Sequence, residues 1–111
     1  NVPEFEMCIA WDSINGGLAG ISTKEKKLRV SWQLDVRPSM QPVVFPESGE
    51  LVINNFENGE DELIVVDIAS GELLSRVKVN ARLANGMFLT PGFSRDIFYC
   101  TTGTFAKVTW I

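Results

Sequence analysis

Residues 63–66 read Leu-Ile-Val-Val, and they repeat a pattern that begins 45 positions earlier, at 18–21, as Leu-Ala-Gly-Ile. The similarity continues past these short runs, although one extra residue enters the second copy. The further matches are Leu28 with Leu73, Leu34 with Val79, Arg37 with Arg82, Pro46 with Pro91, and Glu50-Leu51-Val52-Ile53 with Asp96-Ile97-Phe98-Tyr99. The N-terminal Phe5-Glu6-Met7-Cys8 aligns with Ile97-Phe98-Tyr99-Cys100, and a third copy begins at Phe105.

Short apolar runs bounded by Gly, Pro, Asn and Ser predict an all-β chain. No window carries a helical stripe. A repeat of this length made of short strands is typical of the four-stranded antiparallel blades of a β-propeller. The ten predicted strands are 4–11, 17–22, 28–35, 41–46, 50–55, 62–68, 73–80, 86–91, 96–101 and 104–110.

The sequence predicts one propeller segment over 1–111, with blade-like repeats at about 17–55 and 62–101 and partial blades at 4–11 and 104–110. Such a segment leaves an apolar blade face open at each end, and open faces and edges favour association. Three explanations follow: the remaining blades of a longer chain, several copies that close a ring, or an isolated sheet pair. The repeat favours the first two, because each unit buries its face against a neighbour.

The run Val65-Val66-Asp67-Ile68-Ala69-Ser70-Gly71-Glu72-Leu73-Leu74 resembles the third-strand, turn and fourth-strand motif of quinoprotein-like and YVTN-type β-propellers. In those families an Asp closes the third strand and a Ser-Gly or Thr-Gly pair makes the turn. Quinone-binding members carry a Trp four residues after the turn Gly, where this chain has Ser75. The resemblance therefore implies the fold but no cofactor. It is compatible with an extracytoplasmic location, but the sequence leaves the compartment open.

An immunoglobulin-like β-sandwich is the alternative fold. Cys8, Trp32 and Cys100, with Tyr99 beside the last, resemble the pattern in which a Trp packs on a disulfide between facing sheets. The gap from Cys8 to Trp32 is longer than that pattern has, and a 45-residue repeat has no place in it. In the propeller alignment the two cysteines fall at equivalent places two repeats apart, which predicts two buried, reduced thiols.

Composition excludes several functions. The chain has 111 residues and a formal net charge of −4, which disfavours nucleic-acid and anionic-membrane partners. No apolar run approaches the roughly 20 residues of a membrane-spanning helix, so a soluble protein is expected. There is no histidine, so any reaction that needs imidazole would require a residue from another chain.

The candidate binding residues lie in two loops between predicted blades. Arg37 and Arg82 occupy the same repeat position, and Asn85 follows in the second loop. Arginines around a channel mouth would hold a carboxylate or phosphate through bidentate hydrogen bonds, whereas the alternative is pairing with a neighbouring acid such as Asp35 or Glu47. The expected partners are thus a small anionic ligand or a protein, besides self-association.

No catalytic or metal-binding residue stands out. The acidic loop 54–62 is rich in oxygen ligands, but its spacing does not match a calcium loop, and a solvated turn is expected. Asp67 is expected to cap the amides of the turn that follows it. The sequence therefore predicts a binding or protein-interaction module. The alternative is part of a propeller enzyme, such as a quinoprotein-like dehydrogenase or a lactonase, with its catalytic residues outside this chain.

Overall fold

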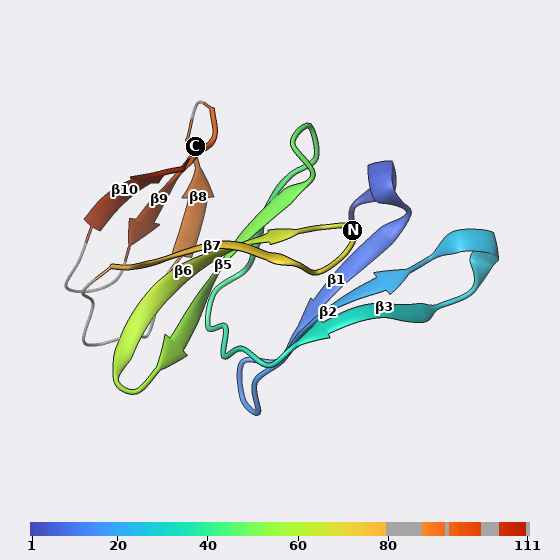
Figure 1. The fold of residues 1–111 in the computed structure, drawn as a ribbon, viewed down its shortest axis with the longest axis horizontal. Helices are drawn as coiled ribbons and strands as arrows, with labels where there is room; N and C mark the ends of the chain where they lie inside the picture. The colour runs from blue at the N-terminus through green and yellow to red at the C-terminus, as the bar shows by residue number, and fades with distance from the viewer. Residues whose placement is uncertain (80–87, 93, 101–104, 111) are drawn as a thin grey trace.

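The computed structural model describes residues 1–79, 88–92, 94–100 and 105–110, and within them the chain forms three antiparallel β-sheets (Figure 1). Two single-turn 3-10 helices, η1 (Pro3–Phe5) and η2 (Lys24–Lys26), accompany the strands. The ten predicted strands are confirmed, with bounds that shift by a few residues. They are β1 (Met7–Trp11), β2 (Leu18–Ser22), β3 (Arg29–Leu34), β4 (Val43–Phe45), β5 (Glu50–Glu57), β6 (Glu60–Asp67), β7 (Leu73–Lys78), β8 (Phe88–Pro91), β9 (Asp96–Cys100) and β10 (Phe105–Thr109).

The strands pair with their neighbours in the chain. Sheet A has the order β1-β2-β3, sheet B the order β4-β5-β6-β7, and sheet C the order β10-β9-β8. In Figure 1 the three sheets lie side by side, with A in blue and cyan, B in green and yellow, and C in orange and red. The predicted all-β class with antiparallel sheets is confirmed. Each predicted repeat, 17–55 and 62–101, takes two strands from one sheet and two from the next.

The 45-residue repeat is present in the strand register. Strand β3 slips against β2 between Gly20 and Ile21. Strand β7 slips against β6 between Val65 and Val66, which are 45 positions further along the chain. A bulge bends and twists its strand, so recurrence at the same repeat position gives sheets A and B the same local shape.

The predicted matches between the outer strands β3 and β7 are wrong by two residues. Ile21 pairs with Val30, whereas its repeat counterpart Val66 pairs with Leu73. The cause is the β2–β3 turn, which contains η2: the chain between the paired residues Ile21 and Val30 is two residues longer than the chain between Val66 and Leu73. The corrected matches are Val30 with Leu73 and Leu34 with Val77, in place of Leu28 with Leu73 and Leu34 with Val79.

The two cysteines do not occupy equivalent places. Cys8 pairs with Ile21 in sheet A, whereas Cys100 pairs with Phe105 in sheet C, and these partners stand three positions apart in the repeat. Both cysteines are thiols, and both are half-buried rather than buried as predicted. The immunoglobulin-like alternative is also wrong, because three sheets are present and Trp32 does not lie on a disulfide.

The central strands of sheet B, β5 and β6, are buried on both of their faces, whereas the edge strand β7 is exposed. Each central strand contains a continuous apolar run, Leu51-Val52-Ile53 in β5 and Leu63-Ile64-Val65-Val66 in β6, which is the pattern of strands covered on both sides. On the side toward sheet A, Leu51, Ile53, Ile64 and Val66 form one cluster with Met7, Leu18 and Trp32. On the side toward sheet C, Val43, Val52, Leu63 and Val65 form a second cluster with Leu89, Ile97 and Tyr99.

Each sheet turns the same side toward the sheet that precedes it. Leu51 and Ile53 of sheet B pack against sheet A, and their repeat counterparts Ile97 and Tyr99 of sheet C pack against sheet B. We call this side the front face of a sheet, and the opposite side its back face. Sheet A packs on sheet B through its back face, which carries Leu18. The three sheets therefore stack front to back in one sense.

Trp32 fastens sheet A to sheet B. Its indole nitrogen donates a hydrogen bond of 2.7 Å to the carbonyl oxygen of Ile68, and the side chain is only 8% exposed. The ring lies directly against the backbone of Gly20 and Gly71: a Cβ atom at Gly71 would stand 2.5 Å from Cγ of Trp32. A glycine at both positions is what allows the indole to enter the interface.

Glu50 fastens sheet B to sheet C. Its carboxylate accepts two hydrogen bonds from the guanidinium of Arg95, at 2.9 and 2.7 Å, and one of 3.2 Å from the indole of Trp110. Burial alone would raise the pKa of Glu50, but hydrogen bonds from Arg95, Ser48 and Trp110 outweigh it, so the pKa is lowered. This acid is therefore held as a carboxylate, in a bidentate pair.

We expect Gly71→Ala to lower the free energy of unfolding by about 1–3 kcal/mol beyond the cost of the backbone conformation, because the new methyl group collides with Trp32. Gly59→Ala is the matched control. Gly59 has φ of +77°, against +76° for Gly71, and a Cβ atom added there would have no atom within 4 Å. Urea unfolding of both variants checks this, and equal losses of stability would contradict the role given to Trp32.

Candidate functional site

Polar side chains gather at one end of sheet B, where the β5–β6 hairpin meets the linker between sheets A and B. The linker runs from 35 to 42. Its Arg37 is held by the hairpin strand: the amide of Arg37 donates 2.7 Å to the side-chain oxygen of Asn55, and its carbonyl accepts 2.9 Å from the amide of Phe56. We call this end, residues 35–42 with 54–62, the polar end.

Asn54 organises the interior of the polar end. Its side-chain oxygen accepts hydrogen bonds from the amides of Ser39 and Met40, at 2.9 and 3.0 Å. Its side-chain nitrogen donates to the hydroxyl of Ser39 at 2.8 Å and to the carboxylate of Asp61 at 3.0 Å. The residue is completely buried, so one amide satisfies four partners and fixes the linker.

Asp61 lies buried between sheets B and C. The hydroxyl of Tyr99, on β9, donates to its second carboxylate oxygen at 2.5 Å, and both residues are 0% exposed. Burial raises the pKa of Asp61, and the hydrogen bonds from Tyr99 and Asn54 only partly offset it. Burial also raises the pKa of Tyr99, and the neighbouring Asp61 adds to this effect.

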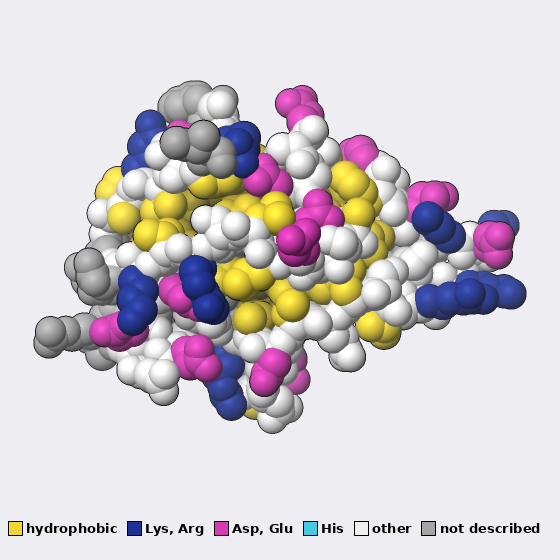
Figure 2. All heavy atoms as spheres, viewed as in Figure 1, with side chains coloured by type: hydrophobic (Ala, Val, Ile, Leu, Met, Phe, Trp, Pro, Cys, Tyr) yellow, Lys and Arg dark blue, Asp and Glu magenta, His cyan; other side chains and the backbone are white. Residues whose placement is uncertain are grey.

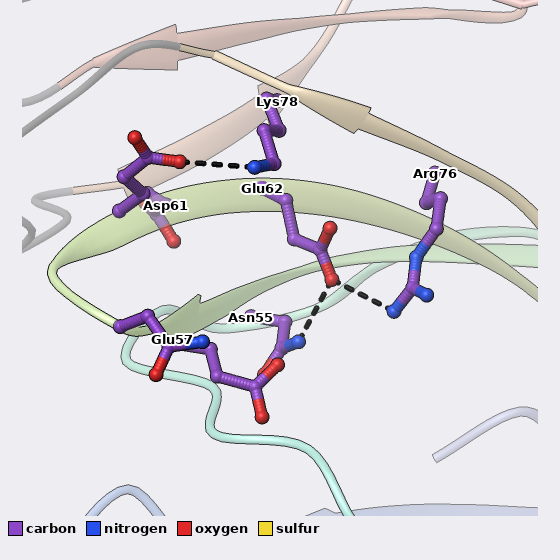
Figure 3. A pocket seen from close by; sticks show the side chains of 8 residues that line it. Asn55, Glu57, Asp61, Glu62, Arg76 and Lys78 are labelled. Carbon is purple, nitrogen blue, oxygen red and sulfur yellow. Dashed lines mark hydrogen bonds and ion pairs between the residues drawn. The ribbon is translucent and has the colours of Figure 1, made fainter.

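A small recess opens on the outside of the polar end, with a volume of about 160 Å³. Figure 3 shows Glu62 pointing toward Asn55 and Arg76, and its carboxylate oxygen accepts 2.8 Å from the former and 2.9 Å from the latter. Lys78 pairs with Glu60 at 3.1 Å. Both basic groups of the recess are therefore already neutralised. Its lining is completed by Glu57, Asn58 and Asp61.

Of the predicted binding residues, the structure places Arg37 at the polar end. Its side chain is exposed and makes no ion pair among the described residues, so the suggested pairing with Asp35 or Glu47 does not occur there. Its Cγ lies close to the Gly16 backbone, because a Cβ atom at Gly16 would stand 3.2 Å from it. Arg82 and Asn85 lie outside the described residues.

The loop within 54–62 is a tight hairpin turn, as its composition indicated. Asn58 and Gly59 connect β5 to β6 with φ of 54° and 77°, the left-handed pair that a two-residue hairpin turn requires. No group of His, Cys, Asp and Glu residues in the described part of the chain is arranged to hold a metal ion. Asp67 caps its turn as predicted, accepting 2.9 Å from the amide of Ser70.

Sequence reasoning missed the two polar pairs of the B–C interface. Asp61 and Tyr99 are 38 positions apart, and Glu50 and Arg95 are 45 apart. The available signal was a polar residue inside an otherwise apolar strand, as with Asn54 after Leu-Val-Ile. Such a residue needs a hydrogen-bond partner when buried, but the sequence does not say which residue supplies it.

Comparisons of the chain with protein-family models, with curated proteins and with solved structures found no match. Across the described residues, none of the helices is long and apolar enough to cross a membrane. Lys24, Lys26, Lys27 and Arg29 form a basic cluster at the tip of the β2–β3 hairpin, where Figure 2 shows Lys and Arg side chains gathered apart from the polar end.

We expect Tyr99→Phe to lower the free energy of unfolding by about 1–3 kcal/mol, because Asp61 would lose a hydrogen bond inside a buried interface. In the double variant Tyr99→Phe/Asp61→Asn the loss should be smaller than the sum of the two single losses, since the residues act as one pair. Chemical unfolding of the four proteins measures this. Additive losses would show that the two side chains are not coupled.

The two buried acids should give stability opposite dependences on pH. The raised pKa of Asp61 means that the folded protein retains this proton more strongly than the unfolded chain. Its favourable contribution is complete below about pH 4 and is lost as pH rises through the folded pKa. The lowered pKa of Glu50 gives a contribution present above its ordinary pKa and lost as pH falls.

Unfolding of Asp61→Asn and Glu50→Gln from pH 3 to 8 separates these effects. Relative to the unaltered protein, Asp61→Asn should gain stability as pH rises, because the variant no longer titrates. The deficit of Glu50→Gln should be largest near neutral pH and should shrink in acid. Parallel pH profiles for all three proteins would contradict both assignments.

Proposed function

We propose that this chain is a segment of a β-propeller that binds a protein partner through the polar end of sheet B. The observation that carries the proposal is the stacking of successive sheets front to back in one sense, with a bulge that recurs after 45 residues. Blades around a propeller axis are related in this way, and inter-blade loops then gather at common ends. The resemblance of 65–74 to quinoprotein-like and YVTN-type repeats agrees with this architecture.

The size of the recess favours a protein partner over a small ligand. Sites that enclose a small molecule usually have volumes of about 300–1,000 Å³ and mostly apolar walls. The recess here has about 160 Å³ and a wall of charged and amide side chains. Its Arg76 and Lys78 are occupied by Glu62 and Glu60, so an anion would have to displace an acid. A protein that contacts the surface around the recess can bind without breaking either ion pair.

Arg37 is the charged side chain that we place at the centre of this contact. The hydrogen bonds of its backbone to Asn55 and Phe56 fix the position of its Cα atom, while its side chain is exposed. A guanidinium held at its base and open at its tip suits a carboxylate presented by a partner, through two parallel hydrogen bonds. The proposed partner is therefore a protein segment with an exposed Asp or Glu.

Selection of displayed peptides on the immobilised chain tests the function. We expect the selected peptides to carry an acidic residue, and Arg37→Glu to weaken their binding at least tenfold. Lys26→Glu is the matched control, because it makes the same charge change at an exposed position on the β2–β3 hairpin. Binding that is unaffected by Arg37→Glu, or lost equally in both variants, would overturn the proposal.

A further inference from the structure

Two faces of the stack have no neighbouring sheet among the described residues: the front face of sheet A and the back face of sheet C. The equivalent faces of the other sheets are buried in inter-sheet contacts. The front face of sheet A carries Cys8 and Ile21, which pair with each other and correspond to Leu51 and Val66 of sheet B. In sheet B those positions are 0% exposed and packed against the neighbouring sheet. Figure 1 shows no further sheet outside A or C among the described residues. The stack therefore ends on two different, unlike faces.

The back face of sheet C is aromatic. Phe98 and Phe105 stack with their ring centres 5.9 Å apart, and Phe105 is 71% exposed. Their repeat counterparts in sheet B are Val52 and Leu63, which are buried against sheet C. Large apolar side chains thus occupy, at the open end, the positions that form the inter-sheet contact elsewhere in the molecule.

The front face of sheet A is correspondingly small. Besides Ile21 and Val30 it carries only Cys8, Ala10 and Ala19 among the paired residues of β1 and β2, and Ala10 pairs with Ala19. The sites that correspond to Cys8 and Ala10 hold Leu51 and Ile53 in sheet B, and Ile97 and Tyr99 in sheet C. The open front face of sheet A therefore has less side-chain volume than the buried front faces of sheets B and C. The open back face of sheet C has larger side chains, Phe98 and Phe105, than the equivalent Val52 and Leu63 of sheet B. Large side chains on one face can fill the space that small side chains leave on the other, so the two faces can pack at the density of a protein interior.

We infer that the front face of sheet A binds the back face of sheet C of a second copy of this chain. The contact continues the front-to-back sense of the A–B and B–C interfaces, so it is head-to-tail: the two copies contribute different surfaces. Such an interface closes into a ring when the rotation permits and otherwise continues as a filament. It is separate from the polar-end contact, since neither Phe105 nor Ala10 belongs to that end.

Charge also suits this contact. In the B–C interface Arg95, just before β9, pairs with Glu50 on the back face of sheet B. The residue of sheet A that corresponds to Arg95 is Glu6, just before β1. Asp96, the counterpart of Glu50, already has Lys107 at 3.4 Å on the back face of sheet C. Lys107 would therefore lie between Asp96 and Glu6 of the second copy, and it supplies the positive charge that Arg95 supplies between sheets B and C.

Complementary variants test the head-to-tail geometry. Phe105→Asp blocks the back face of sheet C, and Ala10→Arg blocks the front face of sheet A. Light scattering should give at least twice the 12.3 kDa monomer mass for the unaltered chain and 12.3 kDa for each variant alone. An equimolar mixture of the variants should recover a dimer and stop there, because one usable face remains on each.

The controls keep folding and association apart. Leu28→Asp alters a residue that is 77% exposed and lies on neither face, so its mass should equal that of the unaltered chain. Circular dichroism and thermal unfolding of each variant check the fold. If Ala10→Arg unfolds, Val30→Asp replaces it, because Val30 is 60% exposed and pairs with Ile21 on the same front face. A monomeric unaltered chain, or a mixture that stays monomeric, would overturn the inference. Peptide binding at the polar end could survive either result.

Discussion

The burial of both faces of the central strands of sheet B is the constraint on which the rest of the structure depends. Strands β5 and β6 have apolar side chains on both sides, so neither face can be left to water. Leu51, Ile53, Ile64 and Val66 are each 0% exposed because sheet A covers them, and Val52 is 1% exposed because sheet C does. Sheet B therefore requires a neighbouring sheet on each side. The preceding and following copies of the 45-residue repeat supply sheets A and C.

This requirement also explains where the polar groups lie. Charged side chains are costly to bury in the middle of strands that are covered twice, so they stand near the strand ends. The buried Asn54 inside β5 is tolerated because its amide has hydrogen-bond partners. Glu50 stands at the start of β5, and Asp61 stands at the start of the antiparallel strand β6, near the opposite end of the sheet. Each finds its partner in sheet C, Arg95 for the first and Tyr99 for the second. The apolar middle sets the distance between sheets, and the two polar pairs fix their alignment.

Much of the fold could be predicted from the sequence because its signals are local. Strand positions follow from short apolar runs and turn residues, and the 45-residue repeat follows from direct comparison. The error in β3 arose where the turn lengths differ, since an alignment without gaps cannot detect the two extra residues near η2. The Asp61–Tyr99 pair could not be predicted, because the contact joins strands of different sheets and depends on how those sheets pack.

The inter-sheet contacts and the polar end differ in how freely their residues can change. A substitution at Leu51 or Val65 alters a contact between sheets, and the repeat requires that contact to recur in each unit. The polar end is free of this demand, because Asn54 and Asn55 hold the linker by its backbone, and the exposed side chain of Arg37 makes no ion pair among the described residues. A different side chain at that position would project from the same fixed point. The contact proposed for the polar end can therefore change while the stacking of the sheets stays the same.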